Sequence, residues 1–92
     1  MEFLIKVRVN PGTMMEFGQK LQKGELDRSC IRGETYCLKS DPAVGYSIWE
    51  AENKNIFDNK FKPWRSYYLD VEIQDVISPN EAMKLLFAKI QK

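Results

Sequence analysis

The 92-residue sequence predicts an α+β protein with one antiparallel four-stranded sheet and two helices packed on one of its faces. Three observations lead to this fold. Four segments show the alternation of apolar and polar residues that indicates strands. Helix signals separate the first strand from the second and the third from the fourth, and a further helical pattern ends the chain. The resulting βαββαβ order is that of a ferredoxin-like fold with an added C-terminal helix, and the length fits a single domain over residues 1–92.

The first strand and the first helix are predicted from residue pattern and turn chemistry. Every second residue of segment 2–9 is apolar, and most residues between are charged, which predicts a strand buried on one face. Asn10-Pro11-Gly12 predicts a turn. A helix is expected to begin after Thr13 and to stop at Gly24, a common C-terminal residue.

The middle of the chain predicts a β-hairpin and a short helix. Residues 31–39 and 44–51 have the residue pattern of strands, and they flank a turn sequence that contains proline. The helix that follows is expected to be capped by Asn53 or Asn55 and to end at Pro63, because proline interrupts the helical hydrogen bonds.

The last strand and the last helix follow directly. Residues 68–77 alternate again, and Ser78-Pro79-Asn80-Glu81 combines a capping box with proline at the first helical position. In the ferredoxin-like topology this last strand lies beside the first.

The sheet face without helices is the expected dimer interface. Charged residues of the first and last strands are expected to face each other there as pairs of opposite charge, and two apolar residues are expected on the same face. The residues predicted at this interface are Leu4, Lys6, Arg8, Trp49, Asp70 and Glu72.

Composition excludes several classes of site. The formal net charge is +1, so the basic excess typical of nucleic-acid-binding proteins is missing. The sequence has no histidine, which excludes a histidine general base and histidine ligation of zinc or haem. Cys30 and Cys37 lack metal-binding or redox spacing and are expected to be reduced thiols. We therefore expect a cytoplasmic protein with no metal, no cofactor and no membrane partner.

The second half of the chain carries a resemblance to a known family. The run Lys-Pro-Trp-Arg-Ser-Tyr-Tyr-Leu-Asp-Val-Glu-Ile at residues 62–73 and the run Val-Gly-Tyr-Ser-Ile-Trp-Glu-Ala at residues 44–51 resemble a family of small bacterial and archaeal proteins. That family is known only as a domain of unknown function. Its members resemble the dimeric α+β barrel superfamily, in which two ferredoxin-like protomers join sheet to sheet. The resemblance implies a homodimer and supplies no activity.

Residues around the proline-tryptophan pair are the expected ligand site. Such barrels are similar in binding apolar ligands between sheet and helices, which implies a pocket for a small apolar molecule. The residues predicted to line it are Trp64, Arg65, Tyr67, Tyr46 and Tyr36.

Three functions remain open from the sequence. The residues favour a binding or interaction module over an enzyme. The alternative is a cofactor-independent enzyme that resembles monooxygenases or isomerases of the superfamily, an inference from fold alone. Binding of single-stranded RNA is a weaker alternative, because Val44 occupies the position where the aromatic RNA-recognition strand has a basic residue.

Overall fold

The computed structural model describes residues 1–90 and contains a four-stranded antiparallel sheet with the order β2-β3-β1-β4. In chain order the elements are β1 (Glu2–Val9), a short 3-10 helix (Pro11–Thr13), α1 (Met14–Gln22), β2 (Ile31–Cys37), β3 (Val44–Glu50), α2 (Lys54–Arg65), β4 (Tyr68–Val76) and α3 (Pro79–Ile90). This is the predicted ferredoxin-like fold with its C-terminal helix. The last two residues of the expected domain, 91–92, lie outside the described residues.

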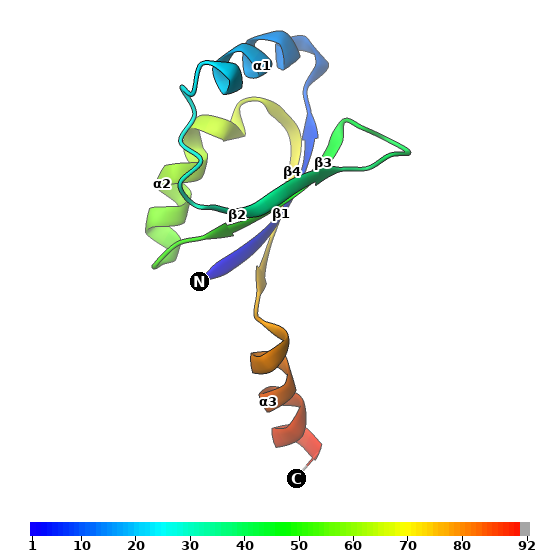
Figure 1. Ribbon diagram of the computed structural model, residues 1–92, viewed down its shortest axis with the longest axis vertical. Coiled ribbons are helices and arrows are strands. Elements are labelled where there is room, and N and C mark those ends of the chain that lie inside the picture. Colours follow the sequence, from blue (N-terminus) through cyan, green and yellow to red (C-terminus); the bar gives the residue numbers. More distant parts are fainter. Residues whose placement is uncertain (91–92) are drawn as a thin grey trace.

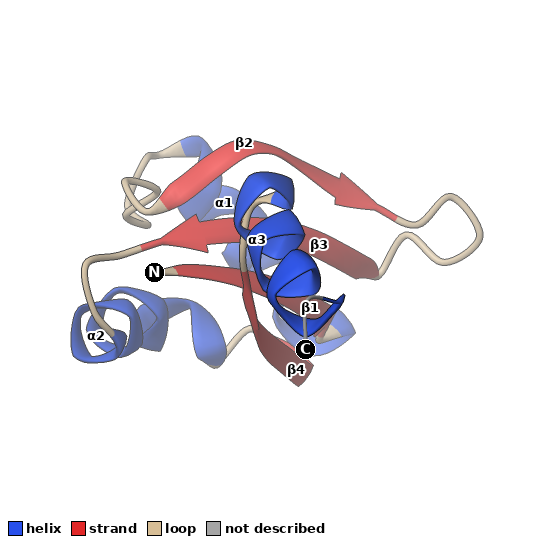
Figure 2. Ribbon diagram, turned by 90° about the horizontal axis from the view of Figure 1, so that it is seen from below, coloured by secondary structure: helices blue, strands red, loops and turns tan. Residues whose placement is uncertain are grey.

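The helices are divided between the two sides of the sheet. Helices α1 and α2 lie on one side, whereas α3 leaves the end of β4 and extends away on the other side (Figures 1 and 2). We call the face under α1 and α2 the inner face and the opposite face the open face. The long dimension of the molecule, 53 Å against 31 and 20 Å, reflects this projecting helix.

The core lies between the inner face and α2. Phe3 and Ile5 of β1 are fully buried, and so is Phe57 of α2. The rings of Phe3 and Phe57 stack with their centroids 4.4 Å apart. Since large aromatic side chains bury more apolar area than other residues, these contacts contribute most of what holds α2 on the sheet.

Trp49 belongs to this core, so its expected place on the open face is wrong. Its side chain is 2% exposed, and it lies directly opposite Phe3 in the β1–β3 register. Its indole contacts the rings of Phe57, Phe61 and Trp64 edge to face, with centroids 5.3–5.8 Å apart. Strand alternation fixes only that neighbours point to opposite faces. The aromatic residues of α2 decide which face Trp49 takes.

Helix α2 also runs past the residue that was expected to end it. Asn53 caps its first turn by accepting a hydrogen bond from the Ile56 backbone N–H at 2.9 Å, as predicted. Pro63, however, lies inside the helix, which continues to Arg65. Proline removes one backbone hydrogen bond from this last turn. The buried Trp64, whose indole N–H donates to the Asp27 carbonyl at 3.2 Å, keeps the turn helical.

Helix α3 leaves its apolar side chains uncovered. Ser78 accepts a hydrogen bond from the Glu81 backbone N–H at 3.2 Å, which confirms the predicted helix start. None of the α3 residues is buried, and Leu86, Phe87 and Ile90 are more than half exposed. Among the described helices, none has the length and apolar character needed to cross a bilayer.

Replacing Trp49 with alanine tests its place in the core. We expect Trp49→Ala to lower the free energy of unfolding by about 3–5 kcal/mol, because the change leaves a large cavity among aromatic rings. Urea denaturation monitored by circular dichroism measures this loss. Met15→Ala, at a position 81% exposed on α1, is the control and should change stability by less than about 0.5 kcal/mol. Equal small losses in both variants would show that Trp49 is not a core residue.

Candidate functional site

A cavity of about 190 Å³ lies between the inner face and helices α1 and α2. Most of its wall is aromatic or aliphatic. The strands supply Ile5, Val7, Val9, Ile31, Trp49 and other residues, while α1 supplies Phe17 and Leu21 and α2 supplies Phe61 and Trp64. We call it the inner cavity. Its volume is comparable to that of dry apolar cavities that hold a single benzene ring.

Two indoles and two phenyl rings form the tightest part of the wall. Trp49 contacts Phe61 and Trp64 edge to face, with centroid distances of 5.3 and 5.5 Å. Phe17 of α1 approaches Trp64 at 6.0 Å and stacks on Tyr67 at 5.0 Å. Because each ring is held by others, the aromatic wall is formed before any ligand arrives.

A few polar groups interrupt this wall. Arg28 comes from the segment between α1 and β2, Tyr68 from the start of β4, and Ser47 from β3. Ser47 accepts a hydrogen bond from the Trp49 indole N–H at 3.0 Å, which leaves its own hydroxyl proton available to a ligand. Burial raises the pKa of Tyr68 to about 12, against a smaller opposing effect of the Arg28 charge. A tyrosine with an ordinary pKa is already a neutral phenol at physiological pH, and burial favours this form of Tyr68 further.

Asp27 ties the segment between α1 and β2 to helix α2. Its carboxylate lies 2.6 Å from the Lys60 ammonium and accepts a hydrogen bond from the Ser29 backbone N–H at 2.8 Å. Its backbone carbonyl accepts from the Trp64 indole at 3.2 Å. The hydrogen bond from Lys60, followed by those from Ser29, holds the pKa of Asp27 well below its usual range. These contacts position Arg28, the next residue, at the edge of the inner cavity.

The five residues predicted to line the pocket do not line a single cavity in the structure. Trp64 lines the inner cavity, whereas Arg65 lies on the surface and donates to the Tyr68 carbonyl at 2.9 Å. Tyr67 is buried in the core, stacked on Phe17, and does not line the cavity.

The other two predicted pocket residues belong to the open face. Tyr36 and Tyr46 are register partners across β2 and β3, and Tyr36 is 67% exposed. Tyr46 also borders the inner cavity, although its ring lies 6.0 Å from the Lys6 ammonium on the open face. A pocket made from all five predicted residues is therefore not present among the described residues.

The residues that complete the inner cavity were missed for identifiable reasons. Ser47 is a polar residue on the same face as Trp49, two positions along the strand, and this was a usable signal. Tyr68 lies at the first position of its strand, where alternation gives no firm direction. Arg28 lies between helix and strand, and no local pattern marks it.

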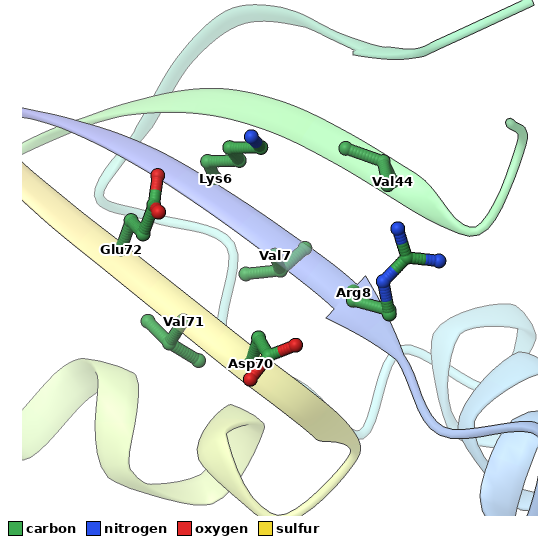
Figure 3. Close-up of a pocket in the computed structure, with 7 residues that line it drawn as sticks. All are labelled: Lys6, Val7, Arg8, Val44, Asp70, Val71 and Glu72. Atoms are coloured by element: carbon green, nitrogen blue, oxygen red, sulfur yellow. The ribbon is translucent and has the colours of Figure 1, made fainter. Parts of the chain in front are cut away.

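The open face carries a hollow of about 240 Å³ between β1, β3 and β4 (Figure 3). Lys6 and Arg8 of β1 lie directly opposite Glu72 and Asp70 of β4 in the strand register, as predicted. The two strands thus place rows of opposite charge side by side on this face. Leu4, the next open-face residue along β1, is half-buried opposite Ile48 of β3.

The expected bonds between these charged rows are not formed within the described residues. Arg8 turns instead to Asp41 of the hairpin loop, with 2.9 Å between guanidinium nitrogen and carboxylate oxygen. Among residues 1–90, Lys6, Asp70 and Glu72 take part in no salt bridge. Facing Cα positions in a twisted sheet do not by themselves bring flexible side-chain ends together, and the hairpin loop offers Arg8 a nearer carboxylate.

Metal-ligating side chains do not gather in the described part of the chain. No group of three or more cysteine, aspartate or glutamate side chains within residues 1–90 could hold a metal ion. Cys30 is buried in the core and Cys37 lies at the rim of the inner cavity, and both are free thiols.

The chain resembles solved structures in its fold but matches no known family or curated protein in its sequence. No protein-family model matches the chain, and no curated protein matches it. The 5-chloro-2-hydroxyhydroquinone dehydrochlorinase of Burkholderia phenoliruptrix AC1100, solved with 2,5-dihydroxybenzoquinone, is 16% identical with a TM-score of 0.54. The match covers 88% of this chain and 98% of the dehydrochlorinase. An antibiotic biosynthesis monooxygenase is 11% identical with a TM-score of 0.48, over 84% of this chain and 98% of its own. At 16% identity the likeness to the dehydrochlorinase shows a shared fold, in agreement with the predicted ferredoxin-like architecture.

Removing the Asp27 carboxylate should make the protein less sensitive to acid. The pKa of Asp27 is lower in the folded than in the unfolded chain, so its contribution to stability is present above pH ~4 and is lost as the pH falls through the folded-state value. We expect Asp27→Asn to be less stable than the original protein at pH 7 and the two to converge toward pH ~2. Urea unfolding at several pH values measures the difference.

Asp58→Asn is the matched control for this experiment. Asp58 forms an exposed ion pair with Lys54, at 2.9 Å, within helix α2 and away from the inner cavity. Exposed ion pairs by themselves contribute little, and within residues 1–90 Asp58 accepts no backbone hydrogen bond of the kind that Asp27 accepts from Ser29. A stability gap for Asp27→Asn that stays constant from neutral to acidic pH would contradict the role of its carboxylate.

Proposed function

We propose that this protein is a homodimer that binds one small aromatic molecule in the inner cavity of each protomer. The observation that carries the proposal is the aromatic wall of the inner cavity, with Trp49 and Trp64 on it. A cavity of about 190 Å³ accepts a single ring and is too small for a large polycyclic ligand. Apolar walls with a few polar groups are the usual composition of small-molecule sites.

The apolar residues of the open face support sheet-to-sheet dimerisation. Leu4 and Ile48 are direct register partners in the middle of this face, and Tyr46 follows on β3. Tyr46 and Ile48 are partly exposed and more apolar than Gly45 and Ser47, which point inward on the same strand. A strand whose outward residues are apolar fits a sheet that is covered on both sides.

The charges of the open face and the position of α3 favour a second copy of this chain as the partner that covers this face. The rows Lys6/Arg8 and Asp70/Glu72 are of opposite sign, and a two-fold axis parallel to the strands and between β1 and β4 would bring each row of one copy over the opposite row of the other. Helix α3 extends on the open-face side with Leu86 and other apolar residues uncovered, and a partner docked there would cover them.

An enzyme that acts on an aromatic substrate is the second candidate. The neutral Tyr68 phenol in the inner cavity favours it, because a protonated hydroxyl in an apolar site can donate a hydrogen bond to a substrate oxygen. The structurally similar dehydrochlorinase was solved with 2,5-dihydroxybenzoquinone, which makes quinone-like rings the first substrates to try. Oxygen uptake and product analysis with hydroquinones distinguish this candidate from binding alone.

The solution mass tests the dimer. We expect size-exclusion chromatography with light scattering to give about twice 10.8 kDa. Ile48→Glu should raise the dimer dissociation constant by roughly tenfold or more, because it buries a charge opposite Leu4. Met15→Glu adds the same charge on the far side of the molecule and should leave the mass unchanged. A monomeric original protein would refute the dimer.

Titration with single-ring aromatics tests the inner cavity. We expect hydroquinone and 2,5-dihydroxybenzoquinone to change the fluorescence of Trp49 and Trp64 and to release or absorb heat in calorimetry, since both indoles line the cavity. Val7→Phe fills the cavity and should abolish binding. Val76→Phe, at the end of β4 outside the cavity wall, adds the same bulk as a control. If no compound tested at millimolar concentration changed the tryptophan fluorescence or gave a heat of binding, the ligand site would be refuted.

A further inference from the structure

The inner cavity carries one uncompensated positive charge. Among the described residues that line it, Arg28 is the only charged one, and no lining residue is a carboxylate. The described part of the chain contains four salt bridges, and none includes Arg28. Arg28, an exposed residue, therefore borders the apolar cavity and has no anionic partner within residues 1–90.

The carboxylate next to Arg28 in the sequence is already engaged. Asp27 lies 2.6 Å from the ammonium of Lys60 and also accepts a hydrogen bond from the Ser29 backbone. These contacts hold its negative charge on the outer side of the segment, against α2. The same contacts fix the segment that carries Arg28, so the cation is presented by an anchored backbone.

The remaining polar groups of the cavity are neutral hydrogen-bonding groups. Tyr68 is protonated at physiological pH, as its ordinary pKa of 10.0 already requires, and burial favours the neutral form further by raising the pKa to about 12. Ser47 holds its hydroxyl oxygen toward the Trp49 indole and keeps a proton to donate. No ionised group in the cavity wall would therefore repel a negatively charged ligand.

We infer that the inner cavity selects single-ring aromatics that carry a negatively charged oxygen group, with the Arg28 guanidinium as the counter-charge. This rests on the proposed ligand site and names the class of ligand that the site prefers. A neutral ring gains only apolar contacts with the aromatic wall. An anionic ring gains those contacts and a charge-assisted hydrogen bond, which is stronger than a neutral one, especially beside an apolar wall.

Benzoate and benzamide are the matched probes, because they have nearly the same shape and differ in charge. In calorimetry we expect the original protein to bind benzoate about tenfold more tightly than benzamide, with the ratio falling as salt is added. Arg28→Gln should abolish the preference by weakening benzoate binding alone. Arg28→Lys keeps the charge and should retain part of the preference. Circular dichroism checks that each variant is folded.

Arg32→Gln is the control for overall charge. Arg32 pairs with Glu50 at 3.2 Å on the sheet, outside the inner cavity, so its loss should leave the benzoate preference intact. Equal binding of both probes by the original protein, or an unchanged preference in Arg28→Gln, would overturn this inference and leave the aromatic site standing. Failure of both probes to bind would overturn the ligand site and the inference together.

Discussion

The burial of Trp49 between the sheet and helix α2 is the contact on which the rest of the structure depends. Its indole meets Phe57, Phe61 and Trp64 at centroid distances of 5.3–5.8 Å, and the side chain is almost fully removed from water. Because successive strand residues point to opposite faces, this one contact fixes the direction of every other side chain on β3. Ser47 then points into the inner cavity, and the intervening residues form part of the open face.

Helix α2 joins the core to the candidate site. Its buried aromatic residues hold it on the sheet, and its outer side holds the segment between α1 and β2 through Lys60 and Asp27. That segment delivers Arg28 to the cavity edge. The geometry of the proposed ligand site thus depends on core packing and on one exposed ion pair, Asp27–Lys60. Lowering the pH until Asp27 is protonated should therefore disturb the site before the core unfolds.

The two faces of the sheet differ in what covers them. The inner face is covered by its own helices, and the space left between them is the inner cavity. The open face combines apolar residues such as Ile48 with rows of opposite charge, in which Lys6, Asp70 and Glu72 form no salt bridge within residues 1–90. Helix α3 extends on the same side with exposed apolar side chains. Exposed apolar area of this extent is costly in water, which is why we propose a second copy on this side.

The sequence by itself determined the order of elements, the start of each strand and the opposition of Lys6 and Glu72, because alternation, capping and turn residues are local signals. It also marked Trp64 as a residue of the pocket. Only the tertiary structure decided that Trp49 faces the helices, that α2 passes through Pro63, and that Arg28 reaches the cavity. Alternation states that neighbours point apart, but which face is inside depends on contacts with aromatic residues of a helix elsewhere in the chain.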